Sequence, residues 1–246
     1  MIRLIRILKI QGSYMKYFII IIVLSQNCLA QDLWIIPKVF LASRTFEYSV
    51  YNSNIKGDIS SIGGGLTGIY RNFYVDIFSE RNIDTNEESI VNSLRNTIKF
   101  ERTDLTTTFG YAVNDSVSIF TGYKYGKSTL TELDFSPFAG AKTSLEGKGF
   151  FIGAGSGWRV KDWGTFSFSA AYAKMQSNYD SFDIGPTEGD ADGTSLGIKW
   201  KAAITTNLYY QLAAIRHEYY YEDFQKISFD ISEQILSYRF GVSYQF

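Results

Sequence analysis

The chain contains few of the residues that support several common kinds of protein chemistry. Among its 246 residues there are one cysteine, one histidine and three prolines. The formal net charge is −1, so there is no basic field that would favour nucleic acid or an anionic membrane surface. Beyond the amino-terminal segment, no apolar run is long enough to cross a bilayer as a helix. If the chain spans a membrane, it does so as a closed barrel, which pairs every backbone polar group.

The amino-terminal segment predicts a secretory signal peptide, residues 1–30. Lys16 supplies the positive start, 17–24 supply an apolar stretch of eight residues, and a small-residue cleavage site ends at Ala30. Residues 1–14 either extend the charged start or precede the true start, which we place at Met15. Cleavage after Ala30 leaves no cysteine and therefore no disulfide or thiol chemistry.

Cys28, the only cysteine, is also the one candidate for lipid attachment. Ser25 and Asn27 do not fit the residues that usually precede such a cysteine, so lipidation is the less favoured alternative. After the signal peptide we predict a short lead-in, 31–37, and a single barrel over 38–246.

Strict alternation of apolar and polar residues is the strongest pattern in the chain. In the last eleven residues one face of a strand carries Leu236, Tyr238, Phe240, Val242, Tyr244 and Phe246, and the other carries Ser237, Arg239, Gly241, Ser243 and Gln245. Such a strand fits either a soluble sandwich or an outer-membrane barrel. The second face is small or charged in strand after strand, which suits a polar lumen and not a soluble core.

The same reading predicts an all-β protein with no helix after the signal peptide. The ten expected strands are 38–52, 58–70, 73–82, 96–113, 116–130, 147–160, 164–180, 193–204, 207–224 and 232–246, with eight as the alternative count. The expected tight turns are 71–72, 114–115, 161–163 and 205–206, and the expected long loops are 53–57, 83–95, 131–146, 181–192 and 225–231. In the first strand Arg44 and Glu47 fall on opposite faces, and the sequence leaves its register open.

Short turns at one end and long loops at the other are typical of bacterial outer-membrane barrels. Aromatic residues gather near the turns and again roughly eight to ten residues further along the strands. A tilted strand needs about 9–11 residues to cross, so the two sets fit two interface girdles. With its signal peptide and its final Tyr-Gln-Phe, the chain resembles a Gram-negative outer-membrane β-barrel of the small porin-family or opacity type. That resemblance implies outer-membrane localisation and makes Phe246 the signal for the barrel-assembly machinery.

Seven charged residues are predicted by alternation to line the lumen: Asp76, Glu80, Lys124, Arg159, Lys199, Lys201 and Arg239. Two acids against five bases predict a positive lumen. The charges either pair in a water-filled network or line a narrow, anion-preferring passage. Since eight strands just enclose their side chains, ten leave a narrow pore at best.

Three motifs suggest other chemistry only weakly. Gly63, Gly65 and Gly68 match a dinucleotide fingerprint but open a strand instead of a helix, so we expect them to allow bending or close approach of a bulky side chain. The run 188–193 resembles half a calcium loop, but Lys199 stands where a bidentate glutamate is required. We therefore predict no metal site and no cofactor.

His217 is predicted to point into the barrel near the long-loop end, where omptin-type proteases place a histidine and acidic residues. A histidine base needs a positioned carboxylate, and Asp183, Asp190 and Asp192 are the candidates. We expect no catalytic residues, and a rim hydrolase is the least favoured alternative.

The sequence thus predicts an integral outer-membrane barrel, porin-like or structural. Surface recognition through the loops 83–95, 131–146 and 181–192 is the main alternative. The expected partners are outer-membrane lipid and lipopolysaccharide, the assembly machinery, and a small solute or surface ligand, with no nucleic acid.

Overall fold

The computed structural model describes residues 33–50, 53–83, 86–91, 94–133 and 140–246. The expected signal peptide and its start at Met15 lie outside these residues. The strands are β1 (Leu33–Val50), β2 (Ser53–Tyr70), β3 (Phe73–Asn82), β4 (Asn86–Val91), β5 (Leu94–Ala112), β6 (Val117–Glu132), β7 (Lys142–Arg159), β8 (Thr165–Ser181), β9 (Gly185–Ala203), β10 (Leu208–Glu222) and β11 (Ile231–Tyr244). A 3₁₀ turn, η1 (Lys161–Trp163), joins β7 to β8.

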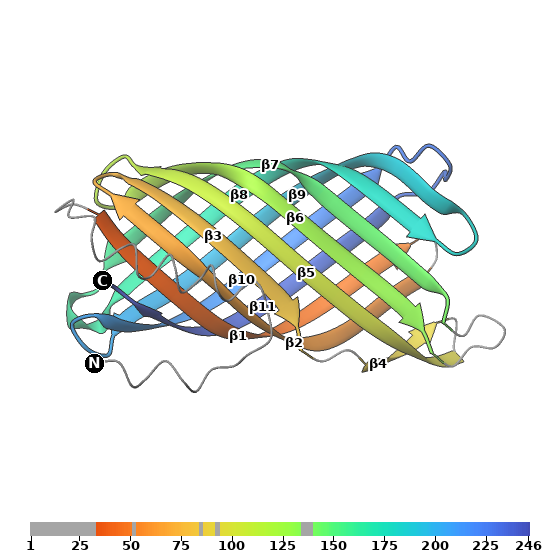
Figure 1. Cartoon of the computed structure of the whole chain (residues 1–246), viewed down its shortest axis with the longest axis horizontal. Helices are drawn as coiled ribbons and strands as arrows, with labels where there is room; N and C mark the ends of the chain where they lie inside the picture. The colour runs from red at the N-terminus through yellow and green to blue at the C-terminus, as the bar shows by residue number, and fades with distance from the viewer. Residues whose placement is uncertain (1–32, 51–52, 84–85, 92–93, 134–139) are drawn as a thin grey trace, which may run out of the picture.

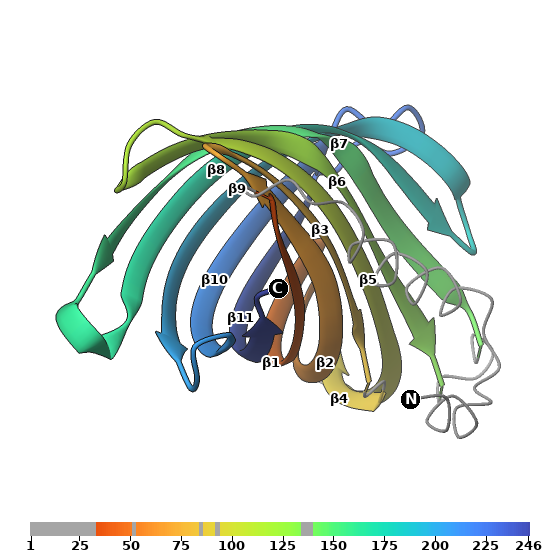
Figure 2. The ribbon, with the colours of Figure 1, turned by 60° about the vertical axis from the view of Figure 1, so that its left-hand side comes forward.

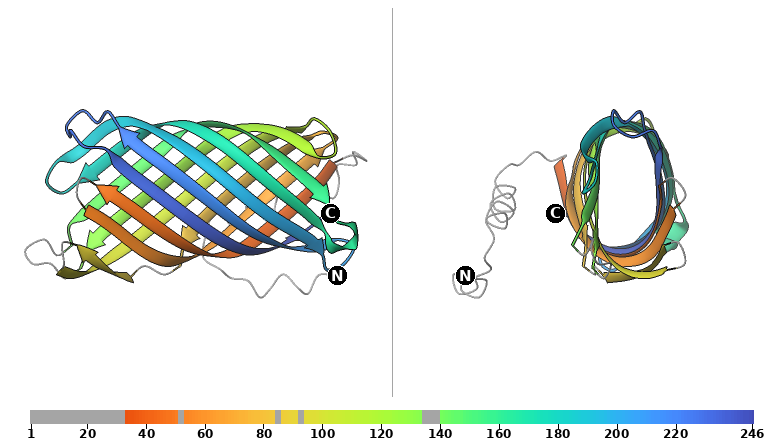
Figure 3. Two further views of the ribbon diagram at one scale, coloured as in Figure 1. Left: turned by 180° about the vertical axis from the view of Figure 1, so that it is seen from behind. Right: turned by 90° about the vertical axis from the view of Figure 1, so that its right-hand side faces the viewer.

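All strands except β4 form one closed antiparallel barrel (Figure 1). Each strand pairs with its neighbours in the chain, β1 pairs with β11, and β3 pairs with β5. The short β4 pairs only with the outer end of β5. Figure 2 shows the tilt of the strands, and the end view in Figure 3 shows them closing around one axis. The predicted all-β barrel of ten strands is confirmed. Among the described residues, no helix has the length and apolar character that crossing a bilayer requires.

The two ends of the barrel differ as the sequence predicts. The short connections 71–72, 113–116, 160–164 and 204–207 lie at one end, together with the start of β1 and the carboxy terminus. There the Phe246 amide donates to the carbonyl of Ile35 at 3.1 Å. By the rule for bacterial barrels this is the periplasmic end, and the opposite end is the outer one.

Several predicted boundaries are wrong. Residues 53–57 belong to β2, β9 begins at Gly185 and so occupies most of the expected loop 181–192, and β1 begins at Leu33, five residues early. The loop 131–146 shrinks to 133–141, and β4 lies inside the expected loop 83–95. In 53–57 and 185–192, polar strand residues were mistaken for loop because the outward face of these segments is polar, whereas the residues added to the start of β1, 33–37, are apolar.

The outward face changes character at one level around the whole barrel. Pairs of successive outward residues mark this switch, with the apolar member on the periplasmic side and the polar member on the outer side: Leu41/Ser43, Ile62/Ser60, Ile77/Ser79, Leu105/Thr103, Tyr125/Lys127, Phe150/Lys148, Tyr172/Lys174, Leu196/Thr194, Ala214/Arg216 and Leu236/Gln234. We call the part of each strand on the periplasmic side of the switch the lipid-facing section, and the rest the outer section.

The lipid-facing section matches the hydrophobic band of a membrane barrel. Its exposed residues include Phe150 at 72% and Ile152 at 66%. An apolar band around a barrel that has no free strand edge is stable in lipid. In the outer section the pattern reverses, with polar residues outward and apolar residues inward. The outer section is therefore built like a small water-soluble barrel that stands beyond the membrane.

Glycines let bulky rings lie flat against the wall. A Cβ on Gly63 would stand 2.1 Å from Cζ of Phe40, and one on Gly110 would stand 2.0 Å from Cζ of Tyr74. The expected role of Gly63, close approach of a bulky neighbour, is confirmed.

Candidate functional site

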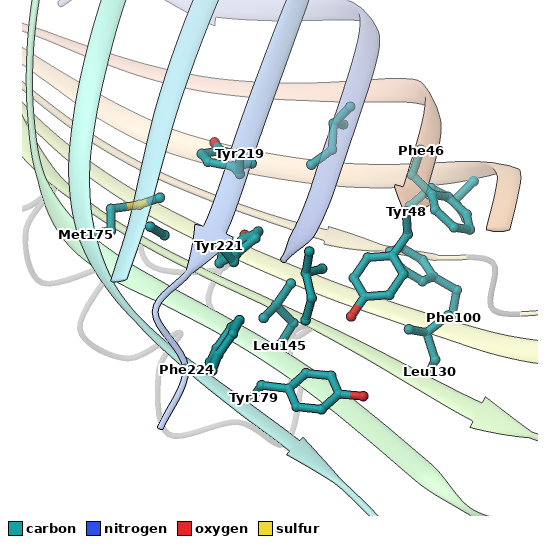
Figure 4. Close-up of a cluster of buried hydrophobic side chains, with 14 of the residues drawn as sticks. Phe46, Tyr48, Phe100, Leu130, Leu145, Met175, Tyr179, Tyr219, Tyr221 and Phe224 are labelled. Carbon is teal, nitrogen blue, oxygen red and sulfur yellow. The ribbon is translucent and has the colours of Figure 1, made fainter. Parts of the chain in front are cut away.

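The lumen of the outer section is filled by an apolar cluster. Its members are Phe46, Tyr48, Ile59, Ile98, Phe100, Leu130, Leu145, Ala173, Met175, Tyr179, Ala191, Tyr219, Tyr221, Phe224, Ile231 and Ile235. Figure 4 shows these side chains converging from strands on several sides of the barrel. The rings of Phe46 and Phe100 stack with their centroids 3.9 Å apart, although β1 and β5 are not paired. This apolar cluster closes the lumen on the outer side.

Burial changes the acidity of the phenols in the cluster. The pKa of Tyr48 lies well above its ordinary value, first because burial disfavours the phenolate and then because charge on Tyr179 and Glu233 repels it. Burial also raises the pKa of Tyr179. Both residues are therefore neutral at physiological pH, as their apolar surroundings require.

Directly beneath the apolar cluster, three arginines and three carboxylates form a network across the lumen. Arg44 on β1 donates to Asp104 on β5 at 2.8 Å, and its Nη1 lies 3.6 Å from Glu80 on β3. Arg102 on β5 contacts Asp104 at 2.9 Å. Neither β3 nor β5 pairs with β1, so the two Arg44 contacts span the interior, whereas Arg102 and Asp104 are neighbours on the inward face of β5.

The network continues to β11, which pairs with β1 and is separated from β5 by three strands. Arg102 donates to Glu233 at 2.5 Å, and Arg239 donates to Glu80 at 2.6 Å. Hydroxyl groups complete it: Ser61 donates to Glu80 at 2.5 Å, and Ser128 donates to Glu233 at 2.6 Å. Three positive and three negative groups balance, as buried charges must.

A cavity of about 320 Å³ lies on the periplasmic side of this network. Four phenylalanine rings and several cationic groups contribute to its wall, and these residues are Phe40, Phe78, Phe120, Phe151, Lys38, Lys124, Lys199 and Arg239. A second space of about 380 Å³ follows it towards the periplasmic end. The two spaces adjoin, because five residues line both: Phe120, Ser169, Lys199, Ala213 and Ile215.

The seven predicted lumen residues divide into three groups. Asp76, Lys124, Lys199 and Arg239 line the cavity, and Glu80 is buried in the network. Lys201 lies with its Nζ 4.2 Å above the Tyr209 ring, outside the cavity wall. Arg159 is exposed at the periplasmic end of β7. The fold therefore brings five of these residues together and leaves two apart.

Five charged lumen residues were missed: Lys38, Arg44, Arg102, Asp104 and Glu233. Two of them, Arg102 and Asp104, follow Ile98 and Phe100 at alternate positions of one strand. Once β5 is known to begin at Leu94, this spacing places all four side chains on the inward face. The register of β1, left open by the sequence, places Arg44 inward and Glu47 outward.

The suggested catalytic arrangement around His217 is not formed. His217 lines the cavity and stacks on Tyr219 with centroids 6.0 Å apart. Asp190 and Asp192 lie on the outward face of β9, with Asp192 accepting from the Tyr172 hydroxyl at 2.7 Å, and Asp183 lies in the 182–184 turn. All three carboxylates are separated from the lumen face that carries His217. Among the described residues, no group of three metal-ligating side chains is present.

Comparison with solved structures agrees with the barrel fold, whereas comparison by sequence finds no relative. No protein-family model and no curated protein matches the chain. The solved structure of the outer membrane protease OmpT from Escherichia coli matches with a TM-score of 0.62 at 10% identity, over 87% of this chain and 97% of that one. The translocator domain of the autotransporter NalP from Neisseria meningitidis matches with a TM-score of 0.53 at 13% identity, over 95% of each chain.

The closed barrel, the apolar outer band and these two matches define the class: the chain is an integral outer-membrane β-barrel. A protease and a translocator share the fold, so the fold alone does not decide the function.

Proposed function

We propose that this protein is a structural barrel of the bacterial outer membrane whose lumen is closed to diffusion at the outer side. The observation that carries the proposal is the apolar cluster, which fills the lumen of the outer section from several strands. Ions cross a pore through water-lined polar space, and a packed apolar interior offers none.

The network of buried charges supports the same proposal. Its bonds join β1, β3, β5 and β11 across the lumen beneath the apolar cluster. A ten-stranded barrel is too narrow to leave a wide channel beside such a crossing. The porin-like alternative therefore requires both layers to open.

An enzymatic role has little support in the lumen. His217 faces the cavity, and none of the three carboxylates considered as its partners lies on that face. A general base needs such a group to orient it. We accordingly propose a protein that is not an enzyme and binds no cofactor.

The predicted partners fit the outer surface. Lys127, Lys148, Lys174 and Arg216 are the first outward residues beyond the switch on β6, β7, β8 and β10. Cations at this level suit the phosphate groups of lipopolysaccharide. The exposed Phe246 beside Tyr244, with ring centroids 4.7 Å apart, suits recognition by the assembly machinery after signal-peptide cleavage in a Gram-negative cell.

Surface recognition is the second candidate, and the outer section favours it. Because this section has its own apolar interior, it presents a folded polar surface outside the membrane and not only loops. Phe182, 76% exposed in the turn between β8 and β9, is the most prominent apolar side chain there.

The proposal predicts that the purified protein conducts no ions in a planar lipid bilayer. Folding of each sample is first verified by heat-modifiable migration on a detergent gel. We expect no discrete current steps from the wild type or from Lys199→Glu. Regular steps whose ion selectivity shifts in Lys199→Glu would contradict the proposal and restore the porin-like alternative.

A further inference from the structure

The cavity beneath the network has the size and wall of a small-molecule site. Its volume of about 320 Å³ lies in the range of ligand pockets, and the 380 Å³ space adjoins it on the periplasmic side. Eight strands just enclose their own side chains, so a ten-stranded barrel has room for a space of this size.

The charge of the cavity wall is not balanced. Five cationic residues line it, Lys38, Arg44, Lys124, Lys199 and Arg239, against the two carboxylates of Asp76 and Asp104. Lys38 contacts Asp76 at 2.5 Å, and Arg44 and Arg239 contact carboxylates of the network. Within the described part of the chain, no carboxylate lies within ion-pair distance of Lys199 or Lys124.

Lys199 occupies the decisive position in this wall. It lies on β9, faces the lumen and lines both spaces, so it stands at their border. By its surface area Lys199 is exposed at this point of the lumen wall. An accessible ammonium group in a confined space of net positive charge favours an anion.

The remaining wall is aromatic. Phe40 and Phe78 stack with centroids 4.7 Å apart, and Phe120 meets Phe151 edge-on at 6.2 Å. The Arg239 guanidinium lies 5.1 Å from the rings of both Phe40 and Phe78. This combination offers flat apolar surface next to fixed positive charge.

We propose that the cavity binds a small amphipathic anion, an aromatic or short aliphatic group bearing one carboxylate, which enters from the periplasm. The acid group lies at Lys199, and the apolar group lies against the phenylalanine rings. Entry is periplasmic because the second space is lined by Asn114, Asp115 and Ser116 of a short turn, whereas the apolar cluster closes the outer side.

Calorimetry on the full chain in lipid nanodiscs tests the ligand class, with 2-naphthoate as probe and empty nanodiscs as blank. We expect saturable binding that weakens about tenfold or more in Lys199→Gln, since one lost charge-assisted contact removes about that factor. Lys199→Arg retains the charge and stays within about threefold of the wild type. Lys201→Gln, two residues further along the same face but outside the cavity wall, serves as the matched control and leaves affinity unchanged.

Three results overturn the proposal: heat no greater than that of empty nanodiscs, equal affinity in Lys199→Gln, or equal affinity for the neutral 2-naphthalenemethanol. The entry route has its own readout in a Cys28→Ser background. A bulky maleimide on Ser118→Cys, at the periplasmic mouth, abolishes binding, whereas the same label on Ser144→Cys in the outer section does not. Undiminished binding with Ser118→Cys labelled contradicts periplasmic entry. Neither result depends on whether the barrel conducts.

Discussion

Replacing Glu80 with glutamine lowers the free energy of unfolding by about 3–5 kcal/mol, because it leaves buried positive charge uncompensated. The Glu80 side chain is fully buried and accepts from Arg239 at 2.6 Å and from Ser61 at 2.5 Å, with Arg44 at 3.6 Å. Glutamine keeps the shape and the bond from Ser61 but removes the charge. Urea titration in phospholipid vesicles, followed by tryptophan fluorescence, measures the loss.

A surface carboxylate provides the matched control. Glu101 pairs with Lys99 at 3.0 Å on the outward face of β5, where its side chain is 49% exposed. Glu101→Gln therefore changes stability by about 0–1 kcal/mol. Adding Arg239→Gln to Glu80→Gln restores part of the loss, since it removes one of the unpaired charges. Equal effects of Glu80→Gln and Glu101→Gln contradict a buried network.

Phe100→Ala is expected to cost about 3–5 kcal/mol, the usual range for a large-to-small change in a packed core. Phe100 is 1% exposed and stacks on Phe46 across the lumen. The change leaves a void between strands that are not paired, so the wall has little freedom to collapse into it. The same urea titration in vesicles reports the difference.

Phe182→Ala is the control for this prediction, because the same atoms are removed from a side chain that is 76% exposed in the β8–β9 turn. Its effect stays within about 0.5 kcal/mol, as for ordinary surface positions. A small effect at Phe100, similar to that at Phe182, is incompatible with a packed apolar cluster in the lumen.

Most of the barrel prediction rests on local sequence patterns. The alternation in 236–246, 196–204 and 117–126 lies in the lipid-facing section, where apolar residues point outward and the period of two is unbroken. The short turns are marked by adjacent polar residues between two such strands. The strand count, the inward phase of Lys124, Lys199 and Arg239, and the placement of the termini followed from these local signals.

The outer section was missed because its pattern runs in the opposite phase. Residues such as Lys56 and Glu188 point outward into water, so a rule that expects apolar residues outside reads them as loop. The cross-lumen partners could not be predicted for a different reason. Arg102 and Glu233 are separated by 131 residues and meet only when the barrel closes.

The central claim is that one barrel has two sections, of which only one contacts lipid. Nitroxide labels at outward positions of β7 test it most directly, through their collision rates with oxygen, which concentrates in lipid, and with a water-soluble nickel chelate. Labels at Phe150, Ile152 and Ala154 should favour oxygen, and labels at Ser144, Glu146 and Lys148 should favour the chelate. Oxygen preference along the whole of β7, from Ser144 to Ala154, would contradict the account.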